Sequence, residues 1–164
     1  MGLPTIEASL PSTNEHDSLS QEPIVTPDFV SVVIPCYNEE RFISKALEQL
    51  AHQYDKEHYE IIVVDGMSDD QTRALFEKFT QSRKELTVSM VDNPRRHIPA
   101  ALNLGVAAAR GSVIARMDAH AIPSEGYIRR CVEVLKQRNV GVVGMPCHVR
   151  PGADSLMARA IAAA

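Results

Sequence analysis

The sequence predicts an α/β domain whose mostly parallel sheet is covered by helices on both faces. From residue 29 onward, short β-branched and apolar runs alternate with amphipathic stretches. Repeated β-α-β units of this kind build parallel sheets. The 164 residues, 45% of them hydrophobic, are enough for the core of one domain. Neither a run of the ~20 apolar residues that span a membrane nor a secretory leader is recognisable in the sequence.

The first 28 residues differ in composition from the rest. They contain no Lys or Arg, and their acids are Glu7, Glu15, Asp17, Glu22 and Asp28. Pro, Ser and Thr are frequent there and apolar periodicity is absent, so residues 1–28 are predicted to be a disordered acidic leader before a folded domain at 29–164. The net charge of −4 argues against nucleic acid as a partner. Three widely spaced cysteines fit a reducing cytoplasm.

Strands and helices are predicted in alternation along the domain. Runs of β-branched and apolar residues predict strands at 30–35, 60–65, 86–91, 112–117 and 140–144. Amphipathic stretches predict helices at 38–52, 69–82, 98–110 and 124–138. Capping residues are expected at Asn38, Asp69 and Ser124, and Gly111 is expected to stop the third helix. Residues 154–164 have helical propensity and end without a stop signal, so the domain is expected to be incomplete at its carboxyl end.

The apolar positions of the first two predicted helices indicate which side chains enter the core. In the first helix these are Phe42, Ile43, Ala46, Leu47 and Leu50. In the second they are Ala74, Leu75, Phe76 and Phe79. Each helix is therefore expected to pack one face on the sheet.

Polar clusters follow four consecutive predicted strands, at residues 35–40, 65–70, 92–97 and 118–120. Ligands of open parallel sheets bind beyond the carboxyl ends of the strands. Helix capping explains about a third of these polar residues, but it does not explain Asp65 or Asp118. Each directly follows an apolar run, where a carboxylate needs hydrogen bonds or a cation. A binding site is therefore predicted at this edge.

Four segments together resemble the inverting family 2 glycosyltransferases, which have the GT-A, Rossmann-like nucleotide-sugar-binding fold. The segments are VSVVIPCYNEE, EIIVVDGMSDDQT, NPRRHIPAALNLGVAAARG and VIARMDAHA, in the order and spacing of that family. The Met-Asp-Ala-His form of the last is most similar to bacterial exopolysaccharide glucosyltransferases of the succinoglycan type. The resemblance implies transfer of a sugar, glucose in that type, from a UDP-sugar to a lipid-linked or polysaccharide acceptor, in the cytoplasm at the inner face of the membrane.

The resemblance also implies which residues bind the donor. The matching positions are Pro35, Tyr37, Asn38, Glu39, Asp65, Arg95, Asn103 and Asp118. Asp65 matches the carboxylate that accepts the uracil N3–H, a role that suits an ionised carboxylate. Tyr37 matches a position that lines the nucleoside pocket, and partial core packing is its alternative role. Arg95 and Arg96 are candidates for the diphosphate, with a solvated surface as the alternative. Leu102 replaces the arginine that usually precedes Asn103 in the family.

Asp118 and His120 occupy the motif of the family that binds a divalent ion, Mn²⁺ or Mg²⁺, although an acid usually stands at the second position. An imidazole suits Mn²⁺ better than Mg²⁺, because Mg²⁺ prefers oxygen ligands. The alternative is that His120 only hydrogen-bonds a loop carbonyl or the diphosphate. Neither Cys36 nor the Cys147-His148 pair has the neighbours that a nucleophile or a zinc site needs. The histidines His16, His52, His58 and His97 are expected on the surface or in the leader.

No residue matches the general base that an inverting transfer needs. The family supplies that base and its acceptor-binding half after the fifth strand, so the chain is expected to be the donor-binding part of a glycosyltransferase. The alternative is a non-catalytic nucleotide-binding or interaction module. A nucleotidyltransferase is disfavoured, because residues 35–41 lack a Gly-rich, basic phosphate loop.

Overall fold

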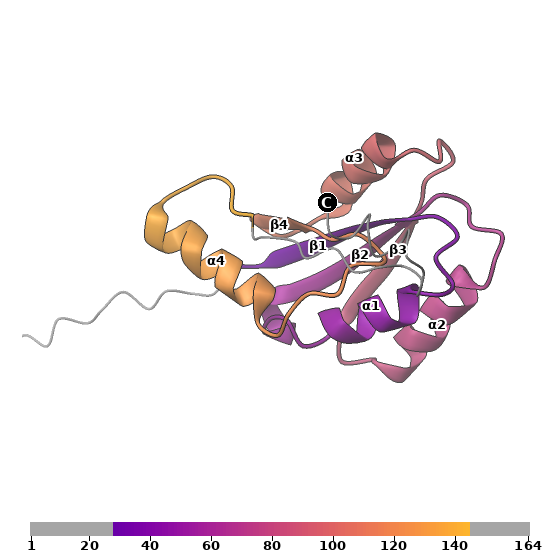
Figure 1. Cartoon of the computed structure of the whole chain (residues 1–164), viewed down its shortest axis with the longest axis horizontal. Helices are drawn as coiled ribbons and strands as arrows, with labels where there is room; N and C mark the ends of the chain where they lie inside the picture. The colour runs from indigo at the N-terminus through magenta and orange to yellow at the C-terminus, as the bar shows by residue number, and fades with distance from the viewer. Residues whose placement is uncertain (1–27, 145–164) are drawn as a thin grey trace, which may run out of the picture.

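The computed structural model describes residues 28–144, which form a four-stranded parallel sheet in the order β3-β2-β1-β4 (Figure 1). The strands are β1 (Val30–Cys36), β2 (Tyr59–Asp65), β3 (Thr87–Asp92) and β4 (Val113–Arg116). The helices are α1 (Ile43–Leu50), α2 (Thr72–Ser82), α3 (Ile98–Ala108) and α4 (Tyr127–Arg138), with a 3₁₀ turn at Lys56–His58. The strand order reverses beside β1, which pairs with β2 on one side and β4 on the other.

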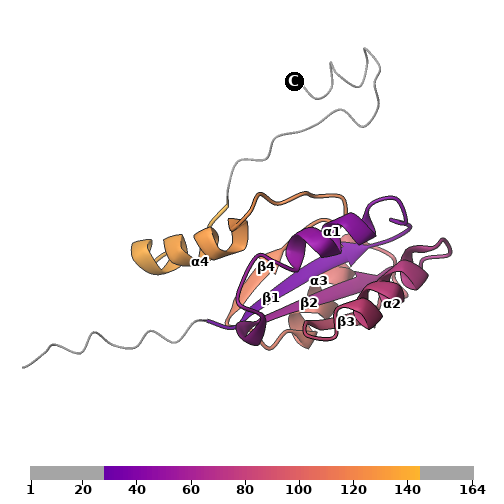
Figure 2. The same ribbon diagram turned by 90° about the horizontal axis from the view of Figure 1, so that it is seen from below.

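Helices cover both faces of the sheet, as the sequence predicts. Figure 2 shows α1, α2 and α4 on one side and α3 on the other. The larger core lies under the first group, where Ile34 of β1 meets Leu47 of α1 and Ile128 of α4 in one buried cluster. The smaller core joins Val33 and Ile62 of the sheet to Ala101 of α3. Since β1 is buried on both faces, its sequence is mostly apolar rather than alternating, and its one hydroxyl, that of Ser31, is hydrogen-bonded to Glu60.

α3 packs against β1 at a position where the helix carries a glycine. A Cβ on Gly105 would come within 2.2 Å of Val33 Cγ1, a distance that real side chains do not tolerate. The absence of a side chain at residue 105 therefore sets the spacing between this helix and the sheet.

A polar clamp fixes the amino end of the sheet. The buried Glu60 accepts hydrogen bonds from the Ser31 hydroxyl at 2.6 Å and from the Arg110 backbone N–H at 2.8 Å. The Arg110 Nε donates to the same carboxylate at 2.9 Å. Burial alone would raise the pKa of Glu60, but these hydrogen bonds outweigh it and hold the pKa below its usual value. The clamp ties the segment after α3 to β1 and β2.

Several predicted boundaries differ from the structure. α1 begins at Ile43 rather than at residue 38, and Phe42 is 44% exposed instead of buried. Ala74 is also exposed, whereas Phe76 and Phe79 are buried as predicted. α4 begins after Gly126, whose φ of 69° places it in the left-handed region, and Ser124 is not its cap. Gly111 lies beyond the end of α3.

The fifth strand predicted at 140–144 is not formed in the described part of the chain. These residues are irregular, and Val142 is 86% exposed. β-branched residues favour a strand only where a neighbouring strand supplies hydrogen bonds and packing. Residues 1–27 and 145–164, including the predicted leader, the Cys147-His148 pair and the final helical segment, lie outside the described residues. Between residues 28 and 144, no helix is long and apolar enough to cross a membrane.

Candidate functional site

The loops that follow β1 and β2 are joined to each other at the carboxyl edge of the sheet. The Asn38 side chain donates to Asp69 Oδ1 at 2.8 Å and accepts the Asp69 backbone N–H at 3.1 Å. The Glu39 N–H donates to the Thr72 hydroxyl at 2.8 Å, and the Glu40 N–H donates to Asp70 at 3.1 Å. Asn38 and Asp69 therefore pair with each other instead of capping helices. Two segments thirty residues apart in sequence form one platform.

Asp65 is the buried centre of this platform. Its side chain has no exposed surface, although it is a carboxylate at the end of an apolar strand. Ser68 donates to it twice, from the backbone N–H at 3.0 Å and from the hydroxyl at 2.5 Å. The Arg73 guanidinium lies 3.1 Å from Oδ2. The cost of burying this charge is met by groups of the chain itself.

Arg73 extends the same network to β3. It bridges Asp65 and Asp92, which are paired in register on β2 and β3, and its contact with Asp92 is 2.5 Å. The backbone N–H of Asn93 donates to the Asp65 carbonyl at 2.7 Å. A hydrogen bond to the Asp92 carboxylate is the largest cause that raises the pKa of Arg73. The ends of β2 and β3 and the first turn of α2 are thereby held together.

A left-handed residue other than glycine occurs in each of the loops after β1, β2 and β3. These are Asn38 at φ 54°, Met67 at φ 61° and Arg96 at φ 56°. Such conformations cost on the order of 1–3 kcal/mol each and persist where the surroundings impose them, often at functional sites. This edge of the sheet is where the fold concentrates backbone strain.

Tyr37 presents an aromatic surface at this edge. Its side chain is 43% exposed, and the Arg96 guanidinium lies 5.5 Å from the centroid of its ring. A Cβ on Gly66 would come within 3.2 Å of Tyr37 Cβ, so the glycine leaves room for the tyrosine beside the end of β2. Tyr37 is thus partly packed against the end of β2 and partly exposed, so its ring has surface free to meet a ligand. An aromatic ring beside a cation suits a flat, charged ligand.

Asp118 and His120 project from the segment after β4 because the residues between and before them are buried. Met117 and Ala119 are 7% and 1% exposed, whereas His120 is exposed. Asp118 Oδ1 accepts from Arg116 at 3.2 Å. His120 Nδ1 lies 3.2 Å from Glu39 Oε1, so the segment after β4 contacts the loop after β1. Sequence reasoning did not pair Glu39 with His120.

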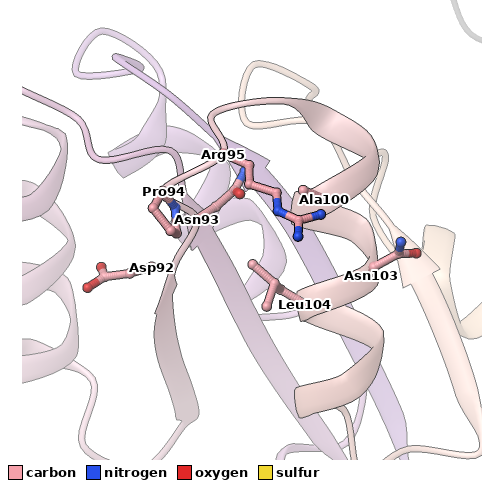
Figure 3. A pocket seen from close by; sticks show the side chains of 7 residues that line it. All are labelled: Asp92, Asn93, Pro94, Arg95, Ala100, Asn103 and Leu104. Carbon is pink, nitrogen blue, oxygen red and sulfur yellow. The ribbon is translucent and has the colours of Figure 1, made fainter.

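A cavity of about 340 Å³ lies between α3 and the loop before it (Figure 3). Arg95 and Asn103, both predicted donor contacts, line it together with Asn93. The Asn93 side chain is 2% exposed, donates to the His97 carbonyl at 3.2 Å, and leaves its Oδ1 without a partner. His97, expected only to be a surface residue, caps α3 by accepting the Ala100 N–H at Nδ1, 3.1 Å away. Histidine is a rare cap, so the pattern gave little signal.

Pro35 and Cys36 complete the end of β1. Pro35 lies in the strand opposite Val64 and is partly exposed. Cys36 is buried opposite Asp65, and burial, with a smaller contribution from the Asp65 charge, raises the pKa of its thiol to about 12. A thiol that stays protonated is a poor nucleophile, in agreement with the sequence prediction.

Comparison with known proteins identifies the family of the chain. The family model described as "Glycosyl transferase family 2" matches residues 31–162. The chain belongs to this family. The predicted resemblance is therefore confirmed. Membership of family 2 explains why all four motifs occur together on a sheet with the order β3-β2-β1-β4.

Relatives of this family 2 chain come from archaea and bacteria. It is 32% identical over 111 residues to "Dolichyl N-acetyl-alpha-D-glucosaminyl phosphate 3-beta-D-2,3-diacetamido-2,3-dideoxy-beta-D-glucuronosyltransferase" of Methanococcus voltae, covering 67% of this chain and 35% of the relative. It is 33% identical over 104 residues to "Succinoglycan biosynthesis protein ExoA" of Rhizobium meliloti, covering 62% and 31%. The chain thus spans about a third of the length of these relatives.

Comparison with solved structures confirms the GT-A, Rossmann-like fold. The mannosyltransferase PcManGT from Pyrobaculum calidifontis, in complex with GDP-Man and Mn²⁺, aligns with TM-score 0.64 and 26% identity over 68% of this chain and 33% of its own. TarS 1–349 of S. aureus, in complex with UDP, aligns with TM-score 0.58 and 23% identity over 73% and 38%. The described strands and helices therefore have the arrangement found in part of a GT-A domain.

Proposed function

We propose that the chain binds the UDP-sugar donor of a glycosyltransferase at the carboxyl edge of its sheet. The observation that carries the proposal is the meeting of the loops after the strands: Arg96 stacks over Tyr37, and Glu39 contacts His120. Aromatic and guanidinium groups suit a nucleoside and its phosphates. Tyr37 would pack on the base, with Arg95 and Arg96 toward the diphosphate.

Asp65 enters this proposal as the residue that holds the platform. Ser68 and Arg73 engage both of its oxygens, and the side chain is buried. A direct contact with the uracil N3–H would require Ser68 to release the carboxylate. Asn38 holds the loops together through Asp69, and Pro35 lies near the end of the strand that presents Tyr37.

Asp118 and His120 would hold a divalent cation together with the diphosphate. Among residues 28–144 no group of three or more His, Cys, Asp or Glu could hold a metal ion alone. Two protein ligands fit an ion whose other positions are filled by phosphate oxygens, and the nitrogen ligand favours Mn²⁺ over Mg²⁺. A bound cation would stabilise the negative charge of the departing diphosphate. The Mn²⁺ and GDP-Man held by the Pyrobaculum mannosyltransferase support cation use.

Glucose is the proposed sugar, and a lipid-linked or polysaccharide acceptor in exopolysaccharide synthesis at the inner face of the membrane is the proposed partner. The succinoglycan biosynthesis relative supports the polysaccharide, and the dolichyl-phosphate relative supports a lipid-linked acceptor. Because the chain spans about a third of these relatives, donor binding is the step assigned to it most directly.

Isothermal titration calorimetry tests this proposal. We expect UDP to bind in the presence of Mn²⁺, GDP to bind more weakly, and a chelator to weaken UDP binding. Tyr37→Ala should lower UDP affinity about tenfold or more, since stacking of a base on an aromatic ring is worth ~1–3 kcal/mol. Asp118→Asn should lower UDP affinity by a similar factor, because it removes the charge of a proposed cation ligand. Glu57→Gln is the control, because Glu57 lies in the 3₁₀ turn before β2 at the opposite edge. Equal binding of UDP and GDP, or none, would contradict the proposal.

A further inference from the structure

Glu39 and His120 meet across neighbouring strands of the sheet. Glu39 follows β1 and His120 follows β4, and Glu39 Oε1 lies 3.2 Å from His120 Nδ1. The Glu39 side chain is 21% exposed and that of His120 is 61% exposed. The carboxylate is therefore partly sheltered, while the imidazole reaches toward the open side of the site.

The backbone fixes both partners independently of their side chains. The Glu39 N–H donates to Thr72, and the Glu39 carbonyl accepts from Phe42 and Ile43, each at 2.9 Å. Around His120, the buried Ala119 and the hydrogen bond from Ala121 N to the Asp118 carbonyl at 2.9 Å hold the segment. Because these contacts use the Glu39 backbone, we expect substitutions of its side chain to leave them in place.

A second contact limits the orientation of the imidazole. The Phe42 ring stands nearly edge-on to that of His120, with centroids 6.3 Å apart and an interplanar angle of 68°. The exposure of Phe42, which helix periodicity did not predict, places it beside this ring. Phe42 and Glu39 together orient the histidine.

The chemistry of the pair selects one tautomer. An ionised carboxylate only accepts hydrogen bonds, so Nδ1 must carry the proton that lies between them. A neutral imidazole protonated at Nδ1 has its lone pair at Nε2. In this form Nε2 can ligate a cation, but it cannot donate a hydrogen bond to a phosphate oxygen.

We propose that Glu39 is a positioning residue that holds His120 as the Nδ1–H tautomer and presents Nε2 to the divalent cation. The inference rests on the proposed function in one respect, the binding of a cation, and does not depend on which sugar is transferred. Carboxylates commonly orient metal-binding histidines in this way. The position of the proton on His120 separates the two roles considered for this residue, because a histidine that donates to the diphosphate would carry its proton on Nε2.

The tautomer can be measured directly on the full chain without nucleotide. In long-range ¹H–¹⁵N spectra of the ¹⁵N-histidine-labelled chain, recorded above the ordinary pKa of histidine, we expect Nδ1 of His120 to show the shift of a protonated nitrogen and Nε2 that of an unprotonated one. His120→Asn assigns the signals by their loss. Glu39→Ala should move the proton to Nε2, whereas Glu39→Gln, which keeps an acceptor oxygen, should largely retain it on Nδ1.

Cation binding gives the second readout. Electron paramagnetic resonance of free Mn²⁺, titrated in the presence of UDP, should show affinity about 10–100-fold lower for Glu39→Ala than for the unmodified chain. Glu39→Gln should lose less, and His120→Asn, which keeps a donor toward Glu39 but lacks Nε2, should lose at least as much as Glu39→Ala. Glu57→Ala removes one charge at the far edge and should change nothing.

The outcomes separate this inference from the proposed function. A proton on Nε2 in the unmodified chain, or a Glu39→Ala variant with unchanged tautomer and Mn²⁺ affinity, overturns the inference even if UDP binds. Absence of UDP binding by the unmodified chain overturns the proposed function, while the tautomer measurement still decides the role of Glu39 toward His120.

Discussion

The Ser68 hydroxyl covers the carboxylate of Asp65: it lies 2.5 Å from Oδ1 and also accepts the backbone N–H of Asn38 at 2.9 Å. The buried acid thereby reaches the loop after β1 through a single hydroxyl. A substitution of Asp65 can therefore weaken ligand binding by disturbing the loop after β1, without any direct contact between Asp65 and the ligand.

We predict that Ser68→Ala and Asp65→Ala, as separate variants, each lower UDP affinity. Removal of the hydroxyl leaves Asn38 N–H and Asp65 Oδ1 without a partner, which costs ~1–3 kcal/mol of stability and loosens the platform. Calorimetry with UDP and thermal denaturation measure the two effects. Ser82→Ala is the control, because it removes a hydroxyl that donates a hydrogen bond to the Phe79 carbonyl at the end of α2. Higher UDP affinity in Ser68→Ala would instead mean that an uncovered Asp65 contacts the base itself.

We predict that UDP binding is stronger with Mn²⁺ than with Mg²⁺ and that His120→Asp narrows the difference. The substitution replaces a nitrogen ligand with oxygen, which Mg²⁺ prefers. Calorimetric titration of UDP with each cation measures the ratio of affinities. A ratio that does not respond to the substitution would remove His120 from the cation site.

Gly105→Ala should destabilise the fold by ~1–3 kcal/mol, because the added methyl would overlap Val33 and push α3 from the sheet. Gly141→Ala is the matched control, since a Cβ there meets nothing within 4 Å. Urea denaturation of both variants gives the comparison. Equal midpoints would show that α3 shifts freely over β1.

The Cys36 thiol should resist alkylation at pH 8 in the folded chain. Its pKa is raised to about 12, mainly by burial, so the reactive thiolate is scarce throughout the neutral range and appears only as the pH approaches that value. Peptide mapping after iodoacetamide treatment, with and without urea, measures the reaction. Cys131, which is partly exposed, provides the internal comparison. Labelling of Cys36 as fast as Cys131 in the folded state would contradict the prediction.

Removal of residues 1–28 should change the melting temperature by only a few degrees. The one ion pair that the structure gives to Asp28 joins it to Lys136 of α4 at 3.0 Å, and both side chains are partly exposed. Such pairs contribute ~0.2–1 kcal/mol. Thermal denaturation of a chain that begins at Phe29 is the measurement, with Lys136→Ala in the full chain as control. A much larger loss for the shortened chain would assign the leader a structural role.

Local sequence pattern predicted much of the fold because its determinants are local. The β-branched runs place all four strands of the described sheet within a few residues of their predicted positions. The helix starts were less predictable. α1 begins late because Asn38 and Glu39 are used in contacts with the loop after β2, and such contacts are invisible to periodicity.

The pairs that build the site could not be predicted from pattern. Glu39 and His120 are 81 residues apart, and their contact depends on β1 and β4 being neighbours. The sequence indicated that Asp65 needs partners, but only the fold shows that Ser68 and Arg73 provide them. The prediction of a fifth strand was wrong for the same reason. Whether a β-branched run forms a strand depends on a pairing strand, which the local sequence does not specify.

The hydrogen bonds between the loops after β1 and β2 limit how these loops can be exchanged between homologues. The Asn38 side chain both donates to and accepts from Asp69, and the Ser68 and Thr72 hydroxyls accept the backbone N–H groups of Asn38 and Glu39. Grafting one loop from a homologue would therefore leave donors and acceptors mismatched in the other. The two segments behave as one cassette, and chimaeras that exchange them together should retain the fold where single-loop chimaeras lose it.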